Sequence, residues 1–401
     1  MKKLLCILLA LTMLLCTACG GQTKDNAADD NGKSANIYTE ITGIAPDETV
    51  MVLGETEVSA AMYFYWVNYI ASSLEQQVQA YNLYYGLYAD KLNADKSLNW
   101  QAEYAAGITF EDYIIAQAKS TIAYLIVVEK MAKTNNISLS DEQIAEIEAI
   151  KASVIESYSA ELAAQDPANE GLLDEEVFDK YLALLGIDYD LFLRLSGFEY
   201  LYDALVEQVM TEGSTLYLSE ADYNEYAFYA DHILIATIDL ATGEALSDEM
   251  IAKKRALAED ILAQLQASDD METLFAQLAD EYSEDTGRTA NPTGYIFTPG
   301  TMVSEFENAV EELEAGGLSG IVESTYGYHI ILRRDLMQGL NENPEKKAEL
   351  AGQHLENLIT LVIENSSVTM KDNITELDHH NMYVTYMEKT SQSTGIETAD
   401  K

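Results

Sequence analysis

The sequence predicts an α+β domain, with a small antiparallel sheet and helices, inserted between mainly helical segments that resemble a chaperone in composition. Apolar side chains recur at helical spacing up to about residue 215, and helical spacing returns from about 344 to 364. Between these segments the spacing is that of strands, most clearly at 227–240. We therefore predict a helical domain at 45–226, the α+β domain at 227–336, and a C-terminal segment at 337–401. A helix of that last segment is expected to pack on the helical domain, followed by a polar tail, because an isolated helix is only marginally stable.

The N-terminus has the pattern of a secretory signal. Lys2 and Lys3 precede an apolar run that is too short to span a bilayer as a mature helix. The run ends in Cys16-Thr17-Ala18-Cys19, which resembles a bacterial lipobox. The resemblance implies a signal peptide at 1–18, a lipid on Cys19, and attachment to the extracytoplasmic face of the cell membrane. Residues 19–44 are polar and predict a flexible tether; the alternative is an uncleaved N-terminal anchor.

Composition excludes several classes of protein. The chain has 401 residues, a formal net charge of −45 and three cysteines, all at or before position 19. Cleavage before Cys19 leaves no pair for a disulfide and no zinc-thiolate site. So acidic a surface argues against nucleic acid or anionic lipid as the main partner. We predict no cofactor and no metal, since the sequence contains no compact aspartate-rich calcium loop.

The helical segment begins after a short strand and turn near Val50. Its clearest helix start is Ser140-Asp141-Glu142-Gln143, in which the serine hydroxyl caps a free amide and the glutamine reaches back. Tyrosine is abundant, with 26 in the chain and the densest group in YNLYYGLYAD at 81–90. These tyrosines either pack amphipathic helices or form an apolar, hydrogen-bonding surface that holds unfolded chains.

The α+β unit has a readable order of elements. A strand at 227–240 is followed by helices at about 248–266 and 271–282, a turn-rich loop, a short helix at about 304–313, and a closing strand that contains His329. We read the order as β-α-α-β-α-β-β.

Several stretches of this unit occur in the order of a known family: HILI (232–235), FAQLADEYSEDTG (275–287), GYIFTPGTMVSEFENAV (294–310) and GGLSGIVESTYGYHIILRR (316–334). They resemble a parvulin-type peptidyl-prolyl cis-trans isomerase domain, and the layout of the chain resembles the PrsA foldase lipoproteins. The resemblance implies catalytic residues at His232, Asp285 and His329. It implies substrate-binding residues at Met302, Phe306, Ser324 and Tyr326, with the first two forming the pocket for the proline ring.

The chemistry of isomerisation suits such residues. The barrier to rotating an X-Pro amide comes from conjugation, so a catalyst needs only to favour the twisted amide. Hydrogen-bonded histidines can hold one tautomer and orient the site. Asp285 either tunes that pair or stabilises the twisted amide, and apolar walls would raise its pKa. The alternative readings are a packed core histidine at 329 and an ordinary helix or turn acid at 285.

The chain also departs from the family. GYIF has one residue more between its glycine and phenylalanine than the commonest form, and Val303 replaces a frequent polar residue, so we expect an altered loop at 291–301. The loop at 236–249 has four acids and no lysine or arginine, so a preference for phosphate before proline is not expected. His354, His379 and His380 lie outside the motif, and the adjacent pair is read as part of a solvated tail.

Two functions are open at this point. The first is an isomerase and foldase for secreted, unfolded polypeptides that contain X-Pro bonds, with dimerisation through the helical domain as a further possibility. The second is a holdase chaperone whose parvulin domain binds peptide without significant catalysis. A solute-binding lipoprotein would need two α/β lobes, whereas this chain has one short α+β unit.

Overall fold

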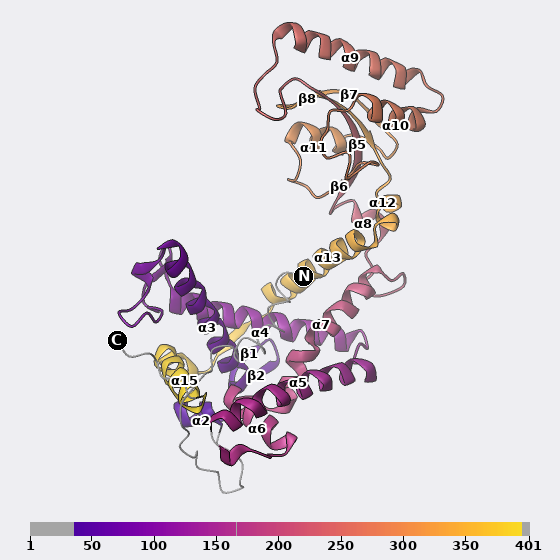
Figure 1. Cartoon of the computed structure of the whole chain (residues 1–401). Helices are drawn as coiled ribbons and strands as arrows, with labels where there is room; N and C mark the ends of the chain where they lie inside the picture. The colour runs from indigo at the N-terminus through magenta and orange to yellow at the C-terminus, as the bar shows by residue number, and fades with distance from the viewer. Residues whose placement is uncertain (1–35, 166, 395–401) are drawn as a thin grey trace. The chain divides into compact units, whose positions relative to one another are not determined.

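The computed structural model describes residues 36–165 and 167–394 (Figure 1). Contacts divide the chain into two compact units, Met1–Leu205 with Glu356–Lys401 and Val206–Leu355. The divisions fall inside α7 (Tyr189–Met210) and α13 (Pro344–Glu364). The predicted signal peptide and Cys19 lie outside the described residues.

The first unit is mainly helical. A three-stranded sheet in the order β2-β1-β9 joins its N-terminal part to its C-terminal part, and β3 pairs with β4 in a separate hairpin. Besides most of α7 and the end of α13, the unit contains α2 (Ile37–Thr42), β1 (Thr49–Leu53), β2 (Thr56–Ser59), α3 (Ala60–Tyr85), β3 (Glu103–Ala105), β4 (Ile108–Thr109), α4 (Phe110–Thr134), α5 (Asp141–Gln165), α6 (Asp174–Leu185), β9 (Val368–Met370), α14 (Asp372–Thr375) and α15 (His379–Thr394).

The predicted helix start at Ser140 is confirmed. The Gln143 amide donates to Ser140 Oγ at 3.2 Å, and the Ser140 amide donates to Gln143 Oε1 at 2.9 Å. Each side chain thus satisfies one backbone donor that the first turn of α5 leaves free.

The tether predicted for 19–44 is wrong over its last residues, because α2 belongs to the folded body. Asn36 caps the helix, and the Tyr38 ring is fully buried against Phe64 and Tyr386. The Asn68 amide donates to the Tyr38 hydroxyl at 3.2 Å. The sequence did not indicate this short helix, because it lies in a polar stretch and Tyr38 packs against residues that are distant in sequence.

The solvated tail predicted around His379 is also wrong. His379 is buried at the start of α15, with Nε2 3.0 Å from the Tyr63 hydroxyl, and the His380 ring lies against Trp100. The buried face of α15 consists of His379, Met382, Tyr383 and Tyr386, which recur at helical spacing with polar residues between them in the sequence.

The second unit contains the predicted β-α-α-β-α-β-β order, and the α+β fold class is confirmed. Its elements are α8 (Glu220–Tyr223), β5 (Phe228–Ala236), α9 (Asp248–Ala267), α10 (Met271–Tyr282), β6 (Tyr295–Phe297), α11 (Ser304–Glu311), β7 (Leu318–Glu323), β8 (Gly327–Arg333), α12 (Leu336–Glu342) and most of α13. The strands form one antiparallel sheet in the order β6-β5-β8-β7.

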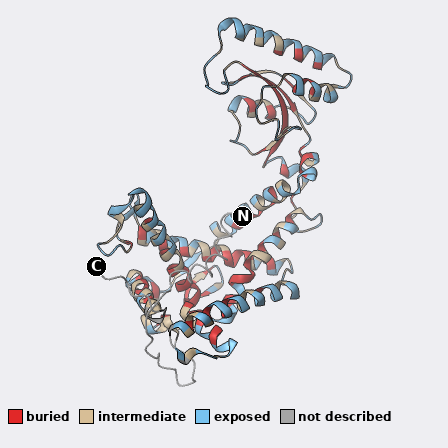
Figure 2. Ribbon diagram, viewed as in Figure 1, coloured by how far each residue is buried: buried red, intermediate tan, exposed pale blue. Residues whose placement is uncertain are grey.

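Helices cover both faces of this sheet, so β5 is buried throughout and β8 is buried up to Arg333 (Figure 2). Alternate residues of β5 and β8, such as Ile233 and Ile330, pack against α9 and α10. The opposite face meets Phe306 and Val310 of α11. Side chains alternate between faces along a strand, so each strand serves two small cores.

The register places both motif histidines on the α11 face. In β5 and β8, His232 pairs with Ile331 and Leu234 pairs with His329. Directly paired residues share a face, as do residues two apart, so the two histidines are diagonal neighbours there. No helix among the described residues is long and apolar enough to cross a membrane.

Candidate functional site

A pocket of about 410 Å³ opens on the α11 face of the sheet. It is lined by His232, Leu234, Leu240, Asp285, Thr286, Tyr295, Thr301, Met302, Val303, Phe306, Tyr326 and His329. The two imidazoles form part of its lining, with ring centroids 5.3 Å apart and planes only 12° from parallel. The Phe306 ring meets both of them edge to face.

The histidines are joined to each other and to Asp285. His232 Nδ1 lies 3.0 Å from His329 Nδ1, and His232 Nε2 lies 3.2 Å from Asp285 Oδ2. An ionised carboxylate only accepts hydrogen bonds, so His232 Nε2 carries the proton. When His232 is neutral, its Nδ1 has no proton and accepts a hydrogen bond. The donor to it is then His329 Nδ1.

The network continues from His329 to Ser324 and Tyr326. With its proton on Nδ1, His329 accepts at Nε2, where the Ser324 hydroxyl donates over 2.7 Å. Ser324 Oγ in turn accepts from the Tyr326 amide at 3.1 Å. The hydrogen bonds therefore run in one direction, from the amide of Tyr326 through both rings to Asp285.

A loop fastened to β5 positions Asp285. Ser283 Oγ accepts from the Leu234 amide, and a Glu284 carboxylate oxygen accepts from the Ala236 amide at 2.8 Å. The Glu284 amide donates to Leu234 O at 2.8 Å. These bonds hold the start of the loop in register with the strand that carries His232.

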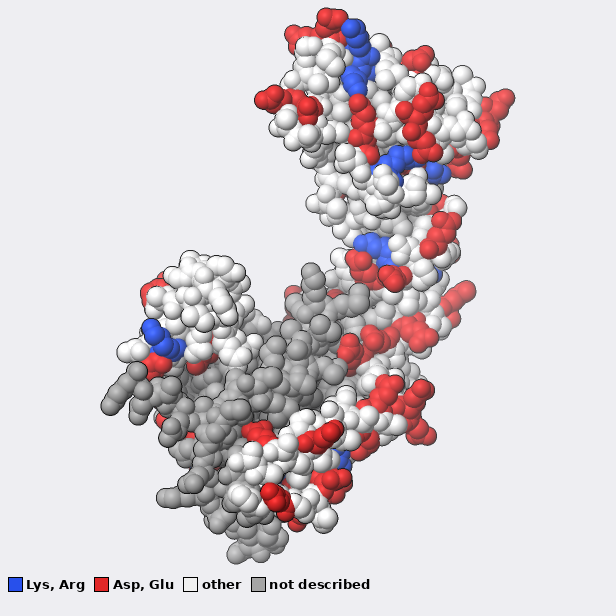
Figure 3. Space-filling view, viewed as in Figure 1, with Lys and Arg blue, Asp and Glu red and all other residues white. Residues whose placement is uncertain are grey.

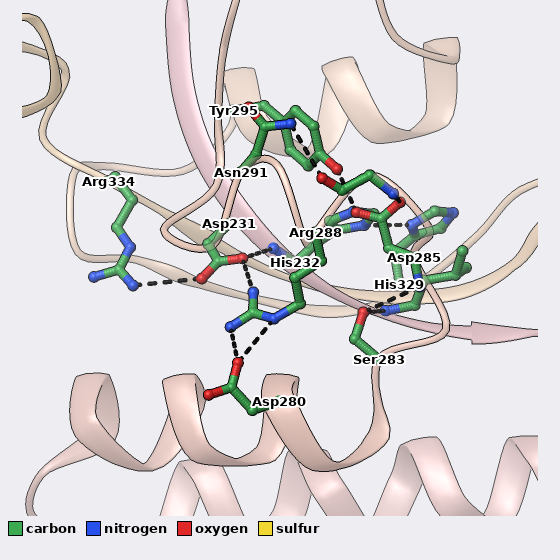
Figure 4. Close-up of polar contacts among 12 residues, drawn as sticks. Asp231, His232, Asp280, Ser283, Asp285, Arg288, Asn291, Tyr295, His329 and Arg334 are labelled. Atoms are coloured by element: carbon green, nitrogen blue, oxygen red, sulfur yellow. Dashed lines mark hydrogen bonds and ion pairs between the residues drawn. The ribbon is translucent and has the colours of Figure 1, made fainter. Parts of the chain in front are cut away.

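An ion cluster centred on the buried Asp231 lies next to the histidines (Figure 4). Asp231, only 1% exposed, accepts from the His232 amide at 2.8 Å and from Arg288 at 2.9 Å. Arg288 also pairs with Asp280 of α10, and Arg334 approaches Asp231 at 3.5 Å. Burial raises the pKa of Asp231, although both arginines favour its ionised form. The cluster ties the backbone of His232 to the turn after Asp285.

The pKa of Asp285 is lowered, which is opposite to the expectation from apolar walls. Burial does raise it, but hydrogen bonds from His232, Tyr295 and the Gly287 amide outweigh that effect. The pKa therefore lies well below the ordinary 3.8, and Asp285 is an anion at neutral pH.

His329 has the opposite environment. It is 4% exposed, and burial lowers its pKa to about 4, with repulsion from His232 adding to the effect. Asp285 and Glu305 counteract this only in part. His329 is thus neutral at physiological pH.

The structure brings the seven predicted residues together, with one difference of position. His232, Asp285, His329, Met302, Phe306 and Tyr326 line the pocket. Ser324, predicted among the substrate-binding residues, is not in that lining and contacts the far nitrogen of His329 instead. Among the described residues no group of three or more His, Cys, Asp or Glu is arranged to hold a metal.

Sequence reasoning missed Tyr295 and Leu240, which also line the pocket. A signal for Tyr295 was present, because it lies two residues before Phe297 on a strand and so faces the same way. Leu240 comes from the loop after β5, whose course the sequence does not specify.

Comparison with known families agrees with the motif. Residues 232–335 match the model described as a PPIC-type PPIase (rotamase) domain, so the chain carries such a domain. The sequence is 41% identical over 104 residues to the foldase protein PrsA of Halalkalibacterium halodurans, covering 26% of this chain and 30% of that protein. It is 36% identical over 149 residues to the foldase protein PrsA of Oceanobacillus iheyensis, covering 35% and 49%. The predicted resemblance is confirmed over this part, and the matches span half or less of these relatives.

A solved structure is similar over a longer stretch. The crystal structure of the peptidylprolyl isomerase PrsA from Bacillus cereus is 20% identical and covers 70% of this chain and 94% of its own. The TM-score is 0.26, which supports no conclusion about the arrangement of the whole chain.

We predict that His329 titrates near pH 4 in an NMR titration of the histidine rings. Its folded pKa lies below the ordinary 6.5, so the unfolded chain binds the proton first as the pH falls. Above pH 6.5 the neutral His329 ring costs the folded protein no stability. Between pH 6.5 and pH 4 the free energy of unfolding falls by about 3 kcal/mol, because the unfolded chain binds this proton more tightly. A midpoint near 6.5 in the folded protein would contradict the buried, neutral ring.

Proposed function

We propose that this chain is an extracytoplasmic peptidyl-prolyl cis-trans isomerase and foldase that acts on secreted, unfolded polypeptides. One observation carries the proposal: two mutually hydrogen-bonded histidines line an apolar pocket beside an ionised aspartate. Uncatalysed isomerisation takes tens of seconds or longer, so a secreted chain that waits for it stays exposed to aggregation.

Met302 and Phe306 would hold the proline ring. Met302 is partly buried and Phe306 is 3% exposed, so the apolar contact surface is fixed before a substrate arrives. The Met302 amide donates to Glu307 at 2.8 Å, and Glu307 also accepts from the Gly300 amide. This bracing holds the loop 300–303 over the pocket and reduces the ordering that binding would require.

The charge of Asp285 favours the twisted amide. A planar X-Pro amide places partial negative charge on its carbonyl oxygen through conjugation, and twisting the bond reduces that charge. A fixed anion at the wall of the pocket disfavours the planar form more than the twisted form, if the carbonyl points toward it. No covalent bond breaks, and the histidines keep the aspartate in place without transferring a proton.

The entrance of the pocket suits substrates without phosphate. The loop between β5 and α9 supplies Leu240 to the lining, and its acids include Asp239 and Glu244. The cations that follow on α9 are engaged, since Lys254 pairs with Glu284. A phosphate group on the residue before proline would be repelled by these acids. The loop between β5 and α9 has no lysine or arginine to bind it.

An exposed aromatic surface in the helical unit favours a second activity, holding unfolded chains. It comprises Tyr81, Leu83, Tyr84, Tyr85, Leu87 and Tyr88, all at least 41% exposed, and the Tyr81 ring contacts those of Tyr85 and Tyr88. In Figure 3 the region at the end of α3 is mostly white, with few charged side chains. Tyrosine and leucine offer contact area to many sequences, which suits a holdase. The exposure of these tyrosines favours the interpretation that YNLYYGLYAD forms a surface for unfolded chains over the interpretation that it packs amphipathic helices.

The remaining partners are proposed from the sequence. Lipidation of Cys19 would attach the protein to the extracytoplasmic face of the cell membrane, and residues up to 35 would link the lipid to α2. Dimerisation through the helical domain stays a prediction.

We predict that residues 20–401 accelerate cis-trans isomerisation of a short X-Pro peptide in a protease-coupled assay. His232→Ala and His329→Ala should each lower kcat/KM at least tenfold, because each interrupts the network that orients Asp285. His354→Ala, which removes an imidazole of α13 outside the pocket, should keep the wild-type rate. Full activity in both site variants, with folding verified by circular dichroism, would refute the isomerase site.

We predict that the triple variant Leu83→Ser, Tyr84→Ser, Tyr85→Ser loses most of its ability to suppress aggregation of an unfolded test protein. It should keep the wild-type rate on the short peptide, because the pocket lies in the other unit. Leu173→Ser with Leu361→Ser is the matched control, since both leucines are exposed but lie outside the aromatic surface. Equal suppression by the triple variant and the control would exclude this surface as the holding site.

A further inference from the structure

Tyr295 reaches the charged end of the histidine network from β6. Its hydroxyl donates to Asp285 Oδ2 at 2.5 Å, the same oxygen that accepts from His232 Nε2 (Figure 4). Asp285 Oδ1 accepts from the Gly287 amide at 3.0 Å. Among the described residues the Asp285 carboxylate thus has three donors, namely His232 Nε2, the Gly287 amide and the Tyr295 hydroxyl.

The surrounding chain leaves room for this hydroxyl. A Cβ atom added at Gly287 would lie 2.3 Å from the Tyr295 oxygen, a distance that no real contact allows. β6 places the ring, since Tyr295 pairs with Ala230 and stands on the pocket side of the sheet. Tyr295 and Gly287 therefore fit each other as a pair.

Asp285 has no lysine or arginine partner within ion-pair distance in the described part of the chain, where its one ion-pair contact is His232. The nearby Arg288 is engaged by Asp231 and Asp280. A partly buried carboxylate without a cation depends on hydrogen-bond donors to stay ionised. The tyrosine hydroxyl is the side chain placed to supply one besides His232 itself.

We propose that Tyr295 is a positioning residue, whose hydroxyl holds Asp285 as the acceptor of the His232 Nε2 proton and so sets the tautomers of both histidines. The proposal deepens the isomerase function and rests on it. Burial and the anion both raise the pKa of the Tyr295 phenol, so it keeps its proton and remains a donor.

The first test is Tyr295→Phe in residues 20–401, which removes only the hydroxyl. A lost hydrogen bond to a charged group predicts a fall in kcat/KM of about tenfold, mostly in kcat. Tyr229→Phe is the control, because this tyrosine also lies in the sheet of the same unit but not in the pocket lining. Gly287→Ala should reproduce the loss by displacing the hydroxyl, whereas Gly320→Ala, with open space around its Cβ position, should not.

The second test separates positioning from general damage. In an Asp285→Asn background, Tyr295→Phe should have almost no further effect on kcat/KM, because the hydroxyl acts through the carboxylate. In the wild-type background, Tyr295→Phe should move the ¹⁵N signal of His232 Nε2 from the protonated position toward the average of two tautomers. A structural defect alone would not produce that shift with an unchanged fold.

Three outcomes would overturn the proposal: an unchanged ¹⁵N signal, additive effects of the two substitutions, or a loss confined to KM. The last would mean that Tyr295 touches the substrate instead. A wild-type protein without activity on the peptide would refute the isomerase function, and the ¹⁵N signal would still test the role of the hydroxyl independently.

Discussion

The contact between His232 Nδ1 and His329 Nδ1 is the constraint on which the site depends. Two nitrogens of the same kind face each other at 3.0 Å, so one must donate and the other accept. The anion at Asp285 determines which, since it accepts a hydrogen bond from His232 Nε2 and so leaves Nδ1 of a neutral His232 as the acceptor. The direction of the next bond follows from that choice, since His329 Nε2 then accepts from the Ser324 hydroxyl. A partly buried network of linked hydrogen bonds restrains its members, which is the property that a preorganised pocket requires.

The fold brings the two histidines together through the register of β5 with β8, and two sets of hydrogen bonds hold the neighbouring backbone. Antiparallel pairing of β5 with β8 makes the histidines diagonal neighbours on one face. The loop at Ser283 and Glu284 is bonded to β5, and the Asp231 ion cluster holds the backbone of His232 from the other side. A slip of one residue in either strand would turn a histidine toward α9 and α10 and abolish the contact. The placement of the two histidines is thus a consequence of sheet register.

The sequence predicted the order of elements in the sheet unit, since strand and helix spacing are clear there. It also indicated the pocket residues, through a resemblance confined to about a quarter of the chain. It did not predict α2 or α15, because Tyr38 and His379 find their partners far away in the chain. The low pKa of Asp285 was missed for a similar reason: apolar neighbours are visible in the sequence, whereas hydrogen bonds from Tyr295 and Gly287 appear only after folding.

The most direct measurement is the protonation state of the four imidazole nitrogens at pH 7, by long-range ¹H–¹⁵N correlation on the wild-type protein with histidines labelled. The directed network predicts protonated Nε2 and bare Nδ1 in His232, with protonated Nδ1 and bare Nε2 in His329. A His232 ring protonated on both nitrogens, or a His329 ring protonated on Nε2, would reverse the direction of the bonds. Either result would contradict the account of how Asp285, the two histidines and Ser324 form one site.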